Sequence, residues 1–139
     1  MRARRWLPVL AITSAAAAFS TAALAARIPA AFANRTWTKT VGASHWYVDL
    51  NTVKHSFALR QAGPTPMKPL VRGTLTVSGS TMTFTDHAGP LACHGASATG
   101  RYRYVLHAKT LQLRLTSIHD ACKGRHSILA GLLDIAPEG

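Results

Sequence analysis

Hydrophobic and polar residues alternate along the chain from Arg35 onward, in runs of about six to eight residues. Turns that contain Gly, Pro, Asp or His separate these runs. No segment in this part repeats its apolar positions at helical spacing, and the frequent Thr and aromatic residues favour strands. The pattern predicts eight strands: Thr36–Val41, His45–Leu50, His55–Gln61, Val71–Ser78, Thr81–Asp86, Gly100–His107, Thr110–Ser117 and His126–Ala130.

The hairpin with the clearest pattern turns at Gly79-Ser80. Pairing outward from this turn puts Val77 opposite Met82, and the next pair on the same face is Leu75 with Phe84. The other face carries threonine pairs: Thr76 with Thr83, and Thr74 with Thr85. A glycine at the first turn position suits a type II′ turn, whose twist matches that of the strands. The arrangement predicts a sheet with one buried face.

A second hairpin is predicted to turn around Ala108-Lys109. Its inward pairs are Leu106 with Leu111, Tyr104 with Leu113, and Tyr102 with Leu115. On the outer face Arg103 lies opposite Arg114, with Arg101 close by. Like charges opposite each other cost a few tenths of a kcal/mol unless they are solvated or share an anion. We interpret this face as solvated, with an anion site as the alternative. A four-residue loop would keep the same residues on each face.

Eight short antiparallel strands in about a hundred residues must protect their edges. Closing the sheet on itself does so, and it predicts an up-and-down barrel whose interior holds packed side chains or one small ligand. A two-layer sandwich is the alternative. Residues 62–70 are expected to form a surface loop because they contain three prolines. Residues 34–139 are too few for two domains, so we expect a single all-β domain.

The N-terminus has the features of an export signal. Basic residues in Met1–Arg5 precede an uncharged stretch, Trp6–Ala26. Two A-x-A cleavage sites follow: Ala23-Leu-Ala25 and Ala31-Phe-Ala33. We favour the second, which makes residues 1–33 a signal peptide. A retained membrane anchor is the alternative, but Ala dominates the stretch and Ser and Thr interrupt it. The protein is therefore expected to be secreted or periplasmic, with no stable membrane span after processing.

The chain is basic, with a formal net charge of +11. Four of its 16 Lys and Arg residues lie in residues 1–33, so the processed chain keeps twelve against five acids, or +7. Outside the cytoplasm, anionic envelope polymers and lipid headgroups are the natural partners of such a chain. Nucleic acid is not expected, because the charge is not clustered and the compartment is wrong. The basic residues available for such a surface are Arg60, Lys68, Arg72, Arg101, Arg103, Arg114, Lys123 and Arg125.

Cys93 and Cys122 are the only two cysteines. An even pair in an exported chain predicts one disulfide, which would close a loop of about 30 residues. The alternative is zinc, bound by these cysteines with nearby histidines: His94, His119 and His126. The spacings match no known zinc motif, so we predict no metal and no cofactor. Asp120 and Arg125 are expected to form a structural ion pair beside the disulfide.

The sequence offers little that suits an enzyme. Ser44, His45 and Asp49 form a candidate catalytic trio, but consecutive residues of a strand point to opposite faces, so Ser44 and His45 diverge. The chain has no G-x-S-x-G turn, no phosphate-binding Gly-rich loop and no metalloprotease helix. We therefore predict a protein without enzymatic activity.

Several motifs occur in an order typical of one family. They are Gly73–Asp86, Gly89–Cys93, Gly100–Tyr104, Leu111–Leu115 and Asp120–Arg125. With this set, the chain resembles secreted bacterial lipocalin-like (calycin) β-barrel domains from about His45 to Gly131. The resemblance implies a barrel that holds a small apolar molecule, and it transfers no catalytic residue.

The leading functional hypothesis is a binding module for a small hydrophobic ligand inside the barrel. The residues expected to contact the ligand are Trp46, Phe57, Phe84, Tyr102, Tyr104 and Leu113. The same residues would equally fill a solid core, and that interpretation stays open. The second hypothesis is a basic envelope protein that binds anionic surface polymers and has no internal ligand.

Overall fold

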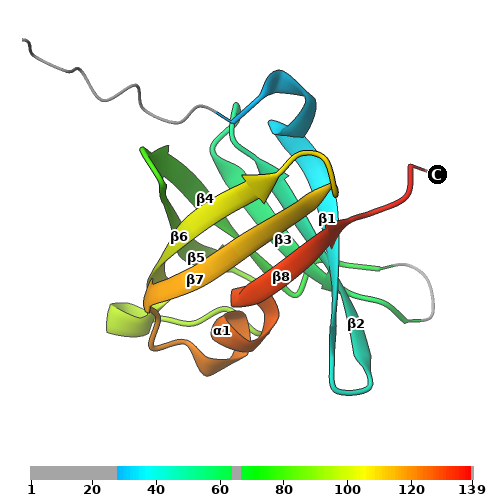
Figure 1. The fold of residues 1–139 in the computed structure, drawn as a ribbon. Coiled ribbons are helices and arrows are strands. Elements are labelled where there is room, and N and C mark those ends of the chain that lie inside the picture. Colours follow the sequence, from blue (N-terminus) through cyan, green and yellow to red (C-terminus); the bar gives the residue numbers. More distant parts are fainter. Residues whose placement is uncertain (1–27, 64–66, 139) are drawn as a thin grey trace, which may run out of the picture.

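The computed structural model describes residues 28–63 and 67–138. Within these residues, eight antiparallel strands each pair with the next, and the last pairs with the first to close a barrel (Figure 1). The strands are β1 (Asn34–Val41), β2 (Ser44–Asn51), β3 (Ser56–Gln61), β4 (Val71–Ser78), β5 (Thr81–Ala88), β6 (Thr99–His107), β7 (Gln112–His119) and β8 (Gly131–Ile135). The predicted all-β barrel is therefore confirmed, and the closure excludes the open sandwich.

Three short helices accompany the barrel: η1 (Ala30–Phe32), η2 (Gly95–Ala98) and α1 (Lys123–Leu129). η1 lies at one end of the barrel and α1 at the other (Figure 1). Residues 1–27, which hold most of the predicted signal peptide and the alternative membrane anchor, lie outside the described residues, as do residues 64–66 of the proline-containing loop. Among the helices that are described, none has the length and apolar character needed to span a bilayer.

The hairpin of β4 and β5 has the predicted register. Leu75 pairs with Phe84 and Val77 with Met82, while the threonines pair on the outer face. Gly79 has a φ of +57°, as the first central residue of a type II′ turn requires. The sequence pattern was sufficient here because a glycine marks the turn and every apolar residue falls on one face.

The register predicted for β6 and β7 is wrong by two residues. Leu106 pairs with Leu113, because the turn is a four-residue loop over residues 108–111. Leu111 ends this loop with a φ of +56°, a backbone conformation that sequence analysis does not expect of leucine. A shift of two residues keeps each side chain on its predicted face, but it changes the cross-strand neighbours. Arg103 therefore pairs with Thr116, and not with Arg114.

The eighth predicted strand is also misplaced. Residues 126–129 of the predicted strand His126–Ala130 belong to α1, and β8 begins at Gly131. α1 buries Arg125, Ile128 and Leu129, which have the i, i+3, i+4 spacing of one helix face. This spacing was missed because its first member is an arginine, which is rarely buried.

Candidate functional site

The six residues predicted to contact a ligand all point into the barrel. Each is at most 8% exposed: Trp46, Phe57, Phe84, Tyr102, Tyr104 and Leu113. Phe84 is fully buried and meets the rings of Phe57 and Tyr102 edge to face, with centroid separations of 5.2 Å and 5.6 Å. These rings belong to β3, β5 and β6, and their contacts form the centre of a continuous hydrophobic core.

Space inside the barrel is small. At the end near η1, side chains that include Trp37, Met82 and Tyr104 enclose a cavity of about 10 Å³. That volume corresponds to about one water molecule, whereas pockets for small ligands usually measure about 300–1,000 Å³. In the described arrangement, the six residues therefore act as core residues, and their contact with a ligand stays a prediction.

A buried cluster of charged residues lies at the opposite end, where α1 meets the barrel. The Arg125 guanidinium donates to both oxygens of Asp120, at 2.9 Å from Nε and 2.6 Å from Nη2. Its Nη1 donates to Asp86 Oδ1 at 2.6 Å. The carbonyl groups of Ala98 and Ser97 accept the remaining two N–H groups, at 2.7 Å and 3.0 Å. All five donors of Arg125 are therefore satisfied, as burial of this group requires.

Neighbouring groups complete the hydrogen bonds of the two carboxylates. Tyr102 donates its hydroxyl to Asp120, which also accepts the backbone N–H of Cys122 at 2.9 Å. Burial raises the pKa of Asp120, but the hydrogen bonds from Arg125 and Tyr102 outweigh it, so the pKa lies below its usual value. Burial, together with the bond to Asp120, raises the pKa of Tyr102. Asp120 is thus held ionised and Tyr102 neutral.

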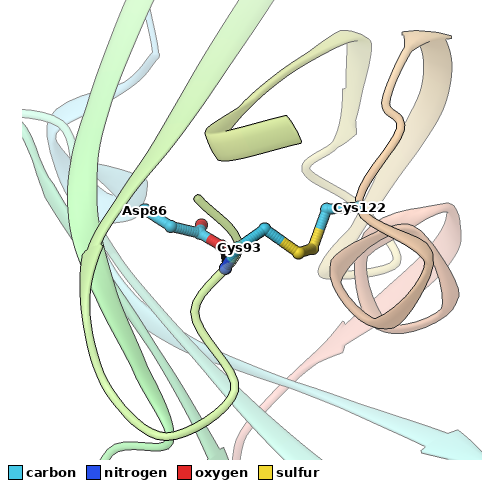
Figure 2. Close-up of side chains that lie close together, drawn as sticks. All are labelled: Asp86, Cys93 and Cys122. Carbon is cyan, nitrogen blue, oxygen red and sulfur yellow. Dashed lines mark hydrogen bonds between the residues drawn. A yellow bond between two sulfur atoms is a disulfide. The ribbon is translucent and has the colours of Figure 1, made fainter. Parts of the chain in front are cut away.

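The predicted disulfide between Cys93 and Cys122 is present and lies beside this cluster (Figure 2). The backbone N–H of Cys93 donates to Asp86 Oδ2 at 2.8 Å, so the carboxylate joins the disulfide loop to Arg125. The possible ligand atoms of Asp86, Cys93 and Cys122 lie within 4.8 Å of one another. Because the two sulfurs are bonded to each other, neither is the thiolate that the zinc alternative needs.

This cluster depends on a glycine. A Cβ atom on Gly100 would lie 2.5 Å from Asp120 Oδ2 and 2.9 Å from Arg125 Nη2, too close for either group. The predicted Asp120–Arg125 ion pair is confirmed, with both side chains fully buried. The part played by Asp86 was missed, although the alternation Met82, Phe84, Asp86 puts all three side chains on the inward face. An inward-facing carboxylate at the end of a strand was the signal for a buried cationic partner.

The candidate catalytic trio is not assembled. Ser44 accepts a hydrogen bond from Gln61, and His45 contacts Thr40 at 3.2 Å. Asp49 instead binds Arg60, with a closest separation of 2.6 Å. Burial raises the pKa of Asp49, but the bonds from Arg60 and Thr36 lower it further than burial raises it. These partners give each residue a structural role on β2 and leave no nucleophile next to a base.

The outer surface of β6 and β7 carries three exposed arginines, Arg101, Arg103 and Arg114, which we call the arginine face. Arg101 and Arg103 alternate along β6, and Arg114 lies on β7 opposite Val105. No ion pair or hydrogen bond joins any of the three to another described residue. The acid nearest in register is Asp134 on β8, which pairs with Gln112 and accepts its side-chain hydrogen bond at 2.9 Å.

A separate apolar cleft opens at the α1 end of the barrel. It has a volume of about 250 Å³. Its apolar lining includes Val41, Trp46, Val71, Leu91 and Ile128. Trp46 contributes the largest of these side chains, and Leu91 is 53% exposed at the rim. Of the six predicted ligand residues, only Trp46 lines this cleft.

Comparison of the chain with protein-family models, with curated proteins and with solved structures finds no match. The closed eight-stranded antiparallel barrel is consistent with the resemblance to lipocalin-like domains. Membership of that family stays a prediction that rests on the sequence motifs.

Proposed function

We propose that the protein is an exported, non-enzymatic barrel that binds anionic polymers of the cell envelope through the arginine face. The observation that carries this proposal is the distribution of charge. Arg101, Arg103 and Arg114 stand together on a rigid sheet, and the described residues supply none of them with an acidic partner. The packed interior supports an activity that uses the outside of the barrel.

The acids of the chain are already used elsewhere. Asp49 binds Arg60, Glu138 binds Arg35, and Asp86 and Asp120 share Arg125. Three arginines on other parts of the structure therefore neutralise four of the five acids. The positive charge that remains is concentrated on surfaces such as the arginine face, where it raises the local concentration of anions.

The geometry of the arginine face suits a polymer with repeated anionic groups. Arg101 and Arg103 are two residues apart on one strand, about 7 Å along its direction. Arg103 pairs with Thr116, and Arg114 lies two residues further along the same face of β7. Guanidinium groups bind carboxylate and phosphate groups through paired hydrogen bonds. Three such donors at fixed spacing would engage successive charges of one polymer chain.

Retention on an immobilised polymer tests this proposal, with long-chain polyphosphate as the probe. The variant Arg101→Gln/Arg103→Gln/Arg114→Gln should elute at a much lower salt concentration than the wild type, because screening weakens surface charge interactions. The control Lys54→Gln/Lys68→Gln/Lys123→Gln removes the same net charge from other exposed positions. It should stay close to the wild type. Equal losses in both variants would show that net charge alone drives retention, and would overturn the proposal.

A second candidate function is the binding of a small apolar ligand, and the cleft that contains Trp46 favours it. Its mainly apolar walls and volume of about 250 Å³ suit a ligand near the lower end of the usual range. The test is saturable fluorescence of an apolar dye. Leu91→Ser alters the exposed rim and should weaken dye binding at least several-fold, whereas Val53→Ser, at an exposed site outside the cleft, should not. Indifference of the dye to Leu91→Ser would exclude this cleft.

A further inference from the structure

The segment that immediately precedes β1 closes one end of the barrel. Phe32 of η1 stacks on Trp37, with ring centroids 6.2 Å apart. Ile28 and Phe32 are half-buried against the hydrophobic core, and both line the cavity of about 10 Å³ at this end. In Figure 1 this segment, drawn in blue, covers the end opposite α1. The described chain is thus packed into the barrel before the first strand begins.

Hydrogen bonds hold this segment in place. The carbonyl oxygen of Ala33 accepts the backbone N–H of Thr52 at 2.7 Å and its hydroxyl at 3.1 Å. Arg35 donates from Nε to the carbonyl oxygen of Ala31 at 2.7 Å. Both acceptors lie in the Ala31-Phe-Ala33 motif that the sequence analysis favoured as the cleavage site. Cleavage after Ala33 would remove them together with Ile28 and Phe32.

We infer that export processing occurs at the other motif, after Ala25, and that residues 28–33 belong to the mature protein as a plug of the barrel. Water hydrolyses the Ala25–Ala26 peptide bond in the active site of a leader-specific protease, which leaves a carboxylate on Ala25 and an amino group on Ala26. The mature chain then keeps the apolar contacts of Phe32 with Trp37. This inference rests on export, and it is independent of the proposed polymer binding.

The first test is the N-terminal sequence of the full chain after export from a bacterial host. The expected mature N-terminus is Ala26, and the alternative, Asn34, lies eight residues further along the chain. Two matched variants disable one motif each. Ala23→Arg should block processing, whereas Ala31→Arg, at an exposed position, should leave it unchanged. A mature protein that begins at Asn34, or that keeps its leader, would overturn the inference.

The second test measures the plug itself in the exported protein. Phe32→Ala should lower the midpoint of thermal unfolding by about 5 °C or more and should increase the fluorescence of an apolar dye, because the barrel end opens. Pro29→Ala, at an exposed position of the same segment, is the control and should change neither. If Phe32→Ala has no effect on the purified protein, the segment is either removed or not packed in the barrel. Both results contradict the inference.

Discussion

Arg125 Nη1 lies 2.6 Å from Asp86 Oδ1, and both side chains are fully buried. The two residues are 39 positions apart, one on α1 and the other near the end of β5. Their contact therefore joins the helix at one end of the barrel to the wall of the barrel. Burying two charges costs several kcal/mol per ion, and only complete hydrogen bonding offsets that cost. Asp120, Ala98 and Ser97 complete the set around the guanidinium.

Arg125→Met is expected to lower the free energy of unfolding by about 3–5 kcal/mol, because it leaves two carboxylates buried without their cation. Urea denaturation followed by tryptophan fluorescence measures the change. The control is Arg114→Met on the arginine face, which should alter stability by no more than about 0.5 kcal/mol. If the two variants prove equally stable, the buried cluster does not support the fold.

Stability should decline as the pH falls below about 4. Asp49 and Asp120 have pKa values below those of the unfolded chain, so each adds stability above its unfolded pKa and loses it as the pH drops through the folded pKa. Asp49→Asn removes one such carboxylate from a partly exposed pair that the fold can tolerate losing. Denaturation midpoints measured from pH 7 to pH 2 should therefore fall less steeply in this variant. A steeper fall in the variant would contradict the assignment.

The inward and outward faces of the strands could be predicted from the sequence because they depend only on alternation. Leu75 and Phe84 are opposite each other as predicted, and all six candidate ligand residues are buried. Alternation does not determine where a turn ends when the turn has no glycine. Leu111 adopts a positive φ, so the loop is two residues longer than predicted and Arg103 lies opposite Thr116.

The sequence revealed half of the buried cluster. Asp120 and Arg125 are five residues apart, so a local ion pair was predictable. Asp86 reaches the same guanidinium only because the barrel closes and α1 covers its end, a tertiary relationship that no short spacing encodes. The packing of Phe32 on Trp37 was missed for another reason, since the segment reads equally well as the end of an export signal.

The disulfide should contribute about 3–4 kcal/mol to stability, because it closes a loop with a sequence separation of 29 and restricts the unfolded chain. Cys93→Ser/Cys122→Ser should therefore unfold at a lower denaturant concentration than the oxidised wild type. Reduction of the wild type should produce a similar shift and raise its mass by about 2 Da. Reducing agent should leave the double variant unaffected. A wild type that carries two free thiols under non-reducing conditions would be incompatible with the bond.

Leu111→Gly is expected to leave stability unchanged or to raise it by up to about 1 kcal/mol. Leucine at a φ of +56° strains the backbone by about 1–2 kcal/mol, and the side chain is 45% exposed, so its removal loses little burial. Glycine costs entropy in the unfolded chain and reduces the gain. Thermal unfolding measures the effect, with Lys109→Gly in the same loop as a control that should destabilise slightly. A loss of more than about 1 kcal/mol in Leu111→Gly would show that the leucine side chain supports the hairpin.

Phe84→Ala is expected to destabilise the barrel by about 3–5 kcal/mol, because it deletes a fully buried ring that contacts both Phe57 and Tyr102. Equilibrium denaturation gives the change directly. Thr83→Ala, on the outer face of the same strand, should cost less than about 1 kcal/mol. The comparison also bears on ligand binding. If the interior opened to accept a ligand in solution, the ring would be less tightly packed, and the cost of Phe84→Ala would lie well below that of a solid core. A near-neutral Phe84→Ala would therefore favour a hollow barrel, whereas the full cost supports a packed one.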